Sequence, residues 1–291
     1  MIRILVNGSE GQIAQELLEL SKTIYNPHLD FIFLNKINWD ITDMAVSEKI
    51  VQAHKPQYII NTAAYTKVDL AESNVEFCYK INATAPSNLA QLCKENDIKL
   101  IHFSSDYIFD DNILQIPIVE NHPKSPRGVY AKSKSLAEDS ILKINSNSLI
   151  IRSSWIYSSY GHNFVKTMLR LGLEKKDLNI VNDQIGSPTY AANIAELVLD
   201  ILLNAVIRNE NLSGIFHYAN SGSCTWYEFA LKIFEFKGIN VNVHPITTKE
   251  FNAAAPRPIY SVLNCNKIKE TLNLTIPHWA DSLKLCLSKI D

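Results

Sequence analysis

The sequence lacks the features that mark membrane, secreted and nucleic-acid-binding proteins. No stretch approaches the roughly 20 consecutive apolar residues that a membrane-spanning helix needs. Arg3 interrupts the apolar start and no small-residue cleavage site follows it, so we expect no secretory signal. The formal net charge is only −2 and no basic run is interleaved with aromatic residues, so nucleic acid is not an expected partner.

Cysteine is scarce, and its spacing forms no known pattern. The five cysteines are an odd number and include no Cys-x-x-Cys pair: Cys78, Cys93, Cys224, Cys265 and Cys286. We therefore expect neither disulfides nor a zinc site. We expect reduced thiols in a cytoplasmic protein instead. The eight histidines show no His-x-x-x-His or clustered spacing, so we expect them to be structural or exposed.

The chain does contain short apolar runs that alternate with amphipathic stretches. Its 291 residues are 46% hydrophobic, enough to bury a large core in one or two domains. After the apolar N-terminal run, we expect strands at 31–34, 58–61, 99–103 and 148–152, and helices at 42–53, at 75–96 and around Tyr130. Such alternation is typical of βαβ units and predicts an α/β fold with a doubly wound parallel sheet.

The alternation loosens after about Ser154. Helices are expected at 163–174, 189–204 and 225–236, strands at 178–181 and 215–219, and short elements between prolines thereafter. We therefore predict a dinucleotide-binding domain over residues 1–155 and a smaller, mainly substrate-binding domain over 156–291. Segments near 176–184 and 213–238 are expected to return to the sheet.

A glycine turn follows the first apolar run at once. Gly8 permits a tight turn, Gly11 lets backbone N–H groups approach a diphosphate, and a helix would begin near Gln12 and Ile13. Ala14 stands where the dinucleotide fingerprint has its third glycine, and its small side chain still allows close packing of helix on strand. Strand, turn and helix in this order favour nucleotide binding over a plain turn.

Tyr130 and Lys134 lie four residues apart, which places a phenol and an ammonium on one face of a helix. A cation near a phenol favours the phenolate, so we expect Lys134 to lower the pKa of Tyr130 from about 10 towards neutrality. The pair could then deliver protons. An isolated Tyr-x-x-x-Lys is common, however, and taken alone it is more often part of an ordinary helix surface than catalytic.

Polar and small residues follow the third and fourth expected strands. Ala63 and Ala64 would let a cofactor pass close to the backbone, and Ser105 and Asp106 offer polar groups just upstream of the Tyr130 helix. Ligands of doubly wound sheets bind beyond the carboxyl ends of the strands. Helix capping or turn formation would also explain the serine and aspartate.

Several motifs together resemble a known family. In chain order they are Gly-x-x-Gly-Gln-x-Ala, Val-Asp-x-Ala-Glu, Ser-Ser-Asp-Tyr-Ile-Phe, Tyr-x-x-x-Lys, Arg-Ser-Ser-Trp and Asn-Asp-Gln-Ile-Gly-Ser-Pro-Thr. They are similar to the dTDP-4-dehydrorhamnose reductase family of extended short-chain dehydrogenase/reductases, over nearly the whole chain. The resemblance implies a Rossmann-like enzyme that uses NAD(P)H to reduce the C4 keto group of a nucleotide sugar in polysaccharide biosynthesis.

The resemblance also implies residue roles. Tyr130 would be the general acid, Lys134 would hold the nicotinamide ribose, and Ser105 would polarise the carbonyl. For cofactor binding it implies Gly8, Gly11, Gln12, Ile13, Asp40, Ile41, Ala63, Ala64, Tyr65, Thr66, Phe103, Tyr130 and Lys134. On the substrate side it implies Ser105, Asp106, Trp155 and Arg257, although a core tryptophan and a surface ion pair remain alternatives for the last two.

The cofactor expectation rests on the residues just after the second strand. Leu34-Asn35-Lys36 lacks the acidic residue that would bond a ribose 2′-OH and repel a 2′-phosphate. NADPH is therefore favoured, and NADH remains possible because Asp40 is close in sequence.

Metal binding and assembly are where the chain departs from the family. Glu16 matches one of the glutamates that hold magnesium near a subunit contact, but Ala192 and Ala280 occupy the other two positions. We therefore expect that site to be absent or weak, and a homodimer is only a possibility. A reductase or epimerase of another nucleotide sugar, and a non-catalytic nucleotide-binding regulatory subunit, remain alternatives.

Overall fold

The computed structural model describes residues 2–23, 28–110, 115–208 and 211–290. Its main sheet has six parallel strands in the order β10-β5-β4-β3-β1-β2. They are β1 (Ile2–Asn7), β2 (Leu29–Leu34), β3 (Tyr58–Asn61), β4 (Lys99–Ser105), β5 (Leu149–Ser153) and β10 (Gly214–His217). The predicted doubly wound parallel sheet is therefore confirmed.

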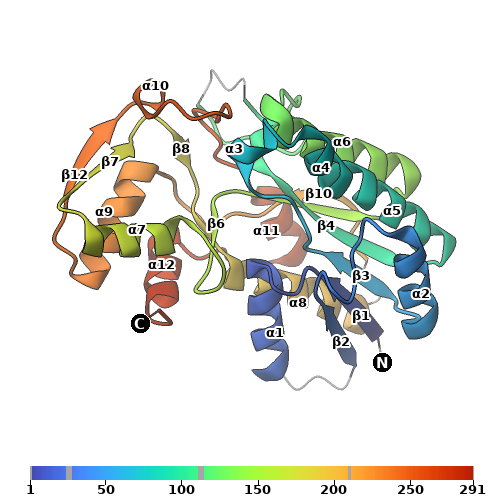
Figure 1. Cartoon of the computed structure of the whole chain (residues 1–291). Helices are drawn as coiled ribbons and strands as arrows, with labels where there is room; N and C mark the ends of the chain where they lie inside the picture. Colours follow the sequence, from blue (N-terminus) through green and yellow to red (C-terminus); the bar gives the residue numbers. More distant parts are fainter. Residues whose placement is uncertain (1, 24–27, 111–114, 209–210, 291) are drawn as a thin grey trace.

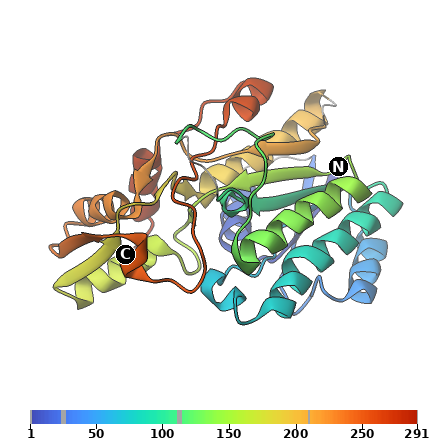
Figure 2. The same ribbon diagram turned by 90° about the horizontal axis from the view of Figure 1, so that it is seen from above.

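Helices cover both faces of this sheet (Figures 1 and 2). One face packs against α1 (Gln12–Thr23), α8 (Ala191–Arg208) and α11 (Asn266–Leu272); the other packs against α2 (Met44–His54), α5 (Ala85–Glu95) and α6 (Gly128–Ile144). The alternation along β1 explains both helix layers: Ile4 and Val6 pack under one face of the sheet, whereas Leu5 packs on the other. Among the described residues, no helix has both the length and the hydropathy for a membrane crossing.

The helical stretch expected at 75–96 has a wide turn in its middle. It consists of α4 (Val75–Tyr79), the π-helical η1 (Lys80–Thr84) and α5. Pro86 lacks the N–H that would bond the carbonyl of Asn82, which accounts for the wider turn there. The Asn82 side chain instead bonds the backbone N–H and carbonyl of Tyr65, at 2.8 and 3.0 Å, and so fixes the loop after β3.

A second core lies beside the first. Its larger elements are α7 (Phe164–Glu174), α9 (Trp226–Lys237), α12 (Trp279–Leu287) and the parallel pair β7 (Asp177–Val181) and β12 (Asn242–Ile246). The shorter elements are α3 (Val68–Ala71), η2 (Asp106–Ile108), β6 (Ile156–Tyr157), β8 (Ile185–Gly186), β9 (Thr189–Tyr190), β11 (Cys224–Thr225) and α10 (Thr248–Phe251). Figure 1 shows α7, α9, α12, β7 and β12 grouped to one side of the main sheet.

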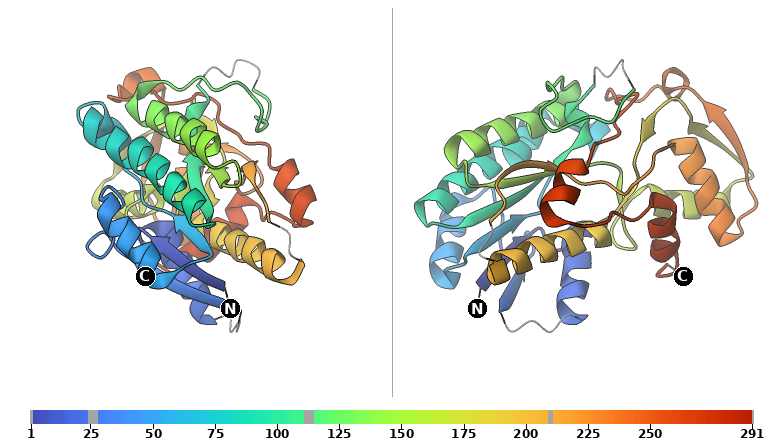
Figure 3. Two further views of the ribbon diagram at one scale, coloured as in Figure 1. Left: turned by 90° about the vertical axis from the view of Figure 1, so that its right-hand side faces the viewer. Right: turned by 180° about the vertical axis from the view of Figure 1, so that it is seen from behind.

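The chain returns to the main sheet in a different way from the one expected. Segment 176–184 does not return, because β7 pairs with β12 in a separate sheet. Within 213–238 only β10 joins the sheet, whereas α9 packs in the second core. The helix expected from residue 189 begins at Ala191, and this long apolar helix runs beside α1 under the sheet (Figure 3). A domain boundary near residue 155 remains a proposal.

Candidate active site

The turn between β1 and α1 brings two backbone segments very close together. Gly8 has a φ of 63°, a left-handed conformation that side chains rarely adopt. A Cβ at Gly8 would lie 2.8 Å from the backbone nitrogen of Ala63, and one at Gly11 would lie 3.1 Å from the carbonyl oxygen of Gly8. Helix α1 begins at the next residue, so its free N–H groups lie beside a turn that has no side chain at Gly8 or Gly11. This arrangement fits a nucleotide diphosphate.

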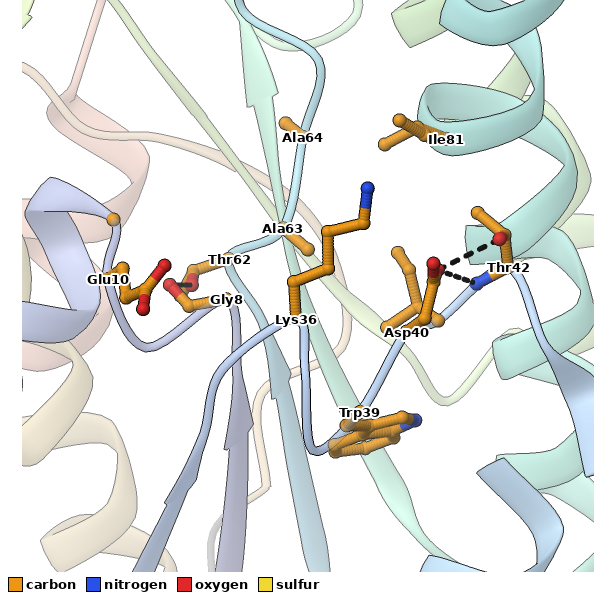
Figure 4. Close-up of a pocket in the computed structure, with 12 residues that line it drawn as sticks. Gly8, Glu10, Lys36, Trp39, Asp40, Thr42, Thr62, Ala63, Ala64 and Ile81 are labelled. Carbon is orange, nitrogen blue, oxygen red and sulfur yellow. Dashed lines mark hydrogen bonds between the residues drawn. The ribbon is translucent and has the colours of Figure 1, made fainter. Parts of the chain in front are cut away.

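A pocket of about 230 Å³ opens beside this turn (Figure 4). Lys36, from the loop after β2, is one of the residues that line the pocket, and Asp40 lies near it. The Asp40 carboxylate accepts hydrogen bonds from the backbone N–H and the hydroxyl of Thr42, at 2.9 and 2.8 Å. The pocket is lined by Gly8, Glu10, Gly11, Lys36, Trp39, Asp40, Ile41, Thr42, Thr62, Ala63, Ala64 and Ile81.

Six of the predicted cofactor residues therefore meet at one cavity: Gly8, Gly11, Asp40, Ile41, Ala63 and Ala64. The remaining predicted contacts do not line this pocket. Ile13 and Phe103 place their side chains in the core, and Gln12 accepts a hydrogen bond from Asn163. Tyr65 packs edge-on against Phe77. Any contact of these residues with a cofactor remains a prediction.

Tyr130 and Ser105 meet at the carboxyl end of β4. The Ser105 hydroxyl lies beside the phenol and favours the phenolate, but burial outweighs this effect and raises the pKa of Tyr130 to about 12. The expected lowering of this pKa by Lys134 is therefore wrong for this structure. A phenol that stays protonated across neutral pH is suited to donating a proton, which is what the reduction of a ketone requires.

Lys134 is almost fully buried, and its ammonium is held by strand β4. Its ammonium donates to the carbonyl oxygen of Phe103 at 2.6 Å and lies 3.3 Å from Nε2 of His102. Burial lowers the pKa of Lys134 to about 8, although the nearby Glu138 carboxylate favours its charged form. An ammonium has three N–H donors, so one remains for a ligand in the cleft.

Asp106 follows Ser105 and is also buried. Its carboxylate accepts a hydrogen bond from the Ser105 hydroxyl at 3.0 Å, and the Ser261 hydroxyl lies beside it. Burial nevertheless raises its pKa to about 6. The predicted polar group at this strand end is thus present, next to the phenol of Tyr130.

Arg257 is paired with Asp69 across the mouth of the site. Two guanidinium N–H groups donate to the two carboxylate oxygens, at 2.7 and 3.1 Å, and Asp69 also accepts from the backbone N–H of Ala255 at 3.0 Å. The guanidinium lies over the ring of Phe251, 5.8 Å from its centre. The ion-pair alternative therefore describes this structure, and diphosphate contact by Arg257 remains a proposal.

The Val-Asp-x-Ala-Glu motif does more than pair with Arg257. Glu72, the last residue of the motif, accepts a hydrogen bond from the backbone N–H of Val129 at 2.8 Å, in the first turn of α6. A Cβ at Gly128 would lie 2.8 Å from this carboxylate. The motif therefore fixes the start of the helix that carries Tyr130, a role that the sequence did not indicate.

Helix α6 is also anchored from below. Arg152 of β5 donates to both carboxylate oxygens of Glu138, at 2.8 and 2.7 Å, and both side chains are at most 2% exposed. The guanidinium also donates to the carbonyl oxygen of Glu120 at 2.9 Å and lies 5.1 Å from the ring centre of Phe109. This buried ion pair ties the helix of Tyr130 and Lys134 to the sheet.

Trp155 stacks on Trp226 from α9. The ring centres are 3.5 Å apart and the planes differ by 6°. Gly186 lies against the edge of the Trp155 indole, where an added Cβ would come within 2.4 Å of Cε2. Both indoles are only partly buried, so they form a partly accessible aromatic surface at the edge of the second core. Trp226 was not predicted as a site residue.

Replacing Gly186 with Ala should disrupt this stack. The new methyl group cannot share space with the indole, so we expect the near-UV circular dichroism of the stacked tryptophans to weaken and the free energy of unfolding to fall by about 1–3 kcal/mol. Adding Trp155→Phe should restore most of the lost stability, because the smaller ring leaves room. A single variant with unchanged stability and dichroism would contradict the predicted overlap.

At the family's magnesium position, where we expect an absent or weak site, the structure has an ion pair. Glu16 is buried, accepts a hydrogen bond from the Ser158 hydroxyl at 2.6 Å and lies 3.6 Å from the ammonium of Lys289. Ala192 and Ala280 supply no oxygen ligands. Within the described part of the chain, no group of three or more His, Cys, Asp or Glu residues could hold a metal ion. The side chains present do not suit a hard divalent cation.

The parallel sheet, the cavity at its glycine turn and the Ser-Tyr-Lys group define a dinucleotide-dependent oxidoreductase of the extended short-chain dehydrogenase/reductase class. Within this class, the chain belongs to the family described as RmlD substrate binding domain, whose model matches residues 2–291.

Individual relatives are similar to this chain over nearly the full length of both proteins. A dTDP-4-dehydrorhamnose reductase of Sinorhizobium fredii is 35% identical, with 97% of this chain and 96% of the relative covered. A Bacillus subtilis protein, named spore coat polysaccharide biosynthesis protein SpsK, is 36% identical, with 98% and 96% covered. The crystal structure of dTDP-4-dehydrorhamnose reductase from Bacillus anthracis in complex with NADP superposes with a TM-score of 0.90, at 37% identity, with 99% and 100% covered.

Proposed function

We propose that this protein reduces the C4 keto group of dTDP-4-dehydro-L-rhamnose to give dTDP-L-rhamnose, with NADPH as the reductant. The observation that carries the proposal is the meeting of Ser105, Tyr130 and Lys134 at the carboxyl end of β4, in a sheet whose glycine turn borders a cavity. Near-full-length relatives named dTDP-4-dehydrorhamnose reductase support the substrate.

The residues of the site can perform the proton half of this reaction. NADPH, when bound, supplies hydride to the carbonyl carbon. The Tyr130 hydroxyl, protonated at neutral pH, donates a proton to the carbonyl oxygen. The Ser105 hydroxyl, which lies beside Tyr130, is placed to polarise the same oxygen. Charged Lys134 stabilises the phenolate that remains and offers its third N–H to the cofactor ribose.

The substrate contacts follow from the groups around this centre. Asp106 is placed to accept a hydrogen bond from a sugar hydroxyl, and the Trp155 indole offers an apolar face to the sugar ring. Arg257 would bind the dTDP diphosphate only by exchanging Asp69 for phosphate oxygens, which suit its planar guanidinium equally well.

One assay tests the proposed function directly. The purified protein is incubated with dTDP-4-dehydro-L-rhamnose and NADPH or NADH, the loss of reduced-nicotinamide absorbance is followed, and the sugar product is identified. Formation of dTDP-L-rhamnose supports the proposal. If a different keto-sugar nucleotide is turned over faster in the same assay, that nucleotide becomes the proposed substrate. If no keto-sugar nucleotide is turned over, a regulatory, non-catalytic role is favoured.

Lys36 should set the preference for NADPH. It is the cation of the pocket at the end of β2, and the neighbouring Glu10 carboxylate is bonded to the Asn35 amide at 3.3 Å. We expect Lys36→Ala to weaken NADPH binding about tenfold, because one charge-assisted contact to the 2′-phosphate is lost. NADH binding should change less than about twofold. Fluorescence titration of both nucleotides measures this, with Lys232→Ala on α9 as control; equal weakening of both would contradict it.

The setting of the reaction is also a proposal. All five cysteines are free thiols and most are buried, which fits a reducing compartment, so we place the reaction in the cytoplasm. The expected partner is a small nucleotide-sugar substrate. A homodimer remains a prediction that sedimentation would test.

A further inference from the structure

Three buried polar side chains form a row beneath the catalytic cleft. Asn61 on β3 and His102 on β4 are register partners, and Lys134 reaches them from α6. Asn61 Nδ2 lies 3.0 Å from His102 Nδ1, and Lys134 Nζ lies 3.3 Å from His102 Nε2. All three side chains are at most 3% exposed. We call this row the Asn61–His102–Lys134 chain.

The arrangement of hydrogens in this chain is constrained by chemistry. Burial and the neighbouring Lys134 cation push the pKa of His102 far below its usual value, so its ring is neutral, with one N–H and one lone pair. An ammonium can only donate. When Lys134 is charged, Nε2 of His102 must therefore supply the lone pair, and the ring proton must reside on Nδ1.

The Asn61 amide supplies an independent clue. In the orientation that the structure shows, its Nδ2 faces His102 and its buried Oδ1 has no hydrogen-bond partner. Turning the amide over gives Oδ1 a donor, the Nδ1–H of His102, and leaves the ring lone pair aimed at Lys134. The Nδ2 group then takes the position that has no partner. The two amide orientations thus match the two histidine tautomers, one for charged and one for neutral lysine.

We propose that His102, oriented by Asn61, is a positioning residue that accepts a hydrogen bond from Lys134 and keeps this lysine charged and directed at the cleft. The proposal rests on the proposed function, because Lys134 matters through its charge beside Tyr130. It revises the expectation that the histidines are merely structural or exposed. The other titratable groups around Lys134 are Glu138 on its own helix and Cys78 on α4, and both favour the charged lysine.

The first test is the pH dependence of kcat/KM in two variants. His102→Leu removes the acceptor, so the charged lysine is less favoured and the basic limb of the profile should move down by about one pH unit. Activity should then fall about tenfold at pH 8.5 and less than threefold at pH 6.5. His102→Gln, whose amide oxygen can take the place of Nε2, should restore the limb. An unmoved limb in a folded Leu variant that still binds NADPH overturns the proposal.

The second test needs no substrate and reads the wild-type protein itself. In the wild-type protein with 15N-labelled histidine, the ring nitrogen shifts of His102, assigned by their absence in His102→Gln or by their coupling to β4, report the tautomer. We expect the Nδ1–H form at pH 6.5. An Nε2–H form or a doubly protonated ring at that pH overturns the proposal, even if the protein reduces no dTDP sugar and the proposed function fails.

Discussion

Replacing Tyr130 with Phe should lower kcat for the keto-sugar reduction by about 10³-fold, equivalent to about 4 kcal/mol of transition-state stabilisation. The phenol is the acid placed beside the Ser105 hydroxyl, and its pKa of about 12 keeps it protonated throughout the neutral range. Phenylalanine retains the ring, including its edge-on contact with Tyr107 at 5.5 Å, and removes only the proton donor. Single-turnover measurements of nicotinamide oxidation give the rate of the chemical step.

Two controls separate chemistry from structure in this experiment. NADPH affinity, measured by fluorescence, should change less than about threefold, because the pocket at the glycine turn is untouched. Tyr218→Phe, a buried tyrosine under the other face of the sheet, should leave kcat unchanged. A Tyr130→Phe variant that turns over within about fivefold of wild type would remove Tyr130 from the mechanism and point to another acid, with Asp106 the nearest buried carboxyl group.

The catalytic pair illustrates what spacing predicts and what it does not. The four-residue interval placed Tyr130 and Lys134 on one helix face, and the structure has both in the first turns of α6. The interval did not reveal that the Lys134 ammonium is held by Phe103 and His102, because those contacts come from strand β4. The predicted pKa of Tyr130 was therefore wrong: burial, which cannot be read from spacing, dominates.

The topology shows a similar limit. Hydrophobic alternation located β7 and β10 within a residue or two, but the same pattern fits a strand in either sheet. The distinction depends on β12, which lies about 60 residues later and contains Pro245, a residue that gave no strong strand signal. Non-local pairing of this kind is not encoded in any short window. For the same reason Trp226 and Glu72 could not be assigned to the site before the fold was known.

Breaking the ion pair beneath α6 should have the largest effect on stability. Arg152→Met leaves the Glu138 carboxylate fully buried without its partner, and we expect the free energy of unfolding to fall by about 3–5 kcal/mol. Lys124, whose ammonium lies 3.6 Å from Glu138, recovers only part of this. Urea denaturation followed by circular dichroism measures the change.

The double variant Arg152→Met with Glu138→Leu separates two contributions to the free energy of unfolding: the stabilisation by the ion pair itself, and the destabilisation by a buried charge without a partner. With both charges replaced by apolar groups of similar size, most of the loss should be regained, because neither partner then has to be desolvated. Reduction should nevertheless remain slower than in wild type, since α6 loses the two directional bonds that tie the helix of Tyr130 to β5. A double variant with wild-type turnover would show that Glu72 and the packing of α6 alone position the catalytic helix.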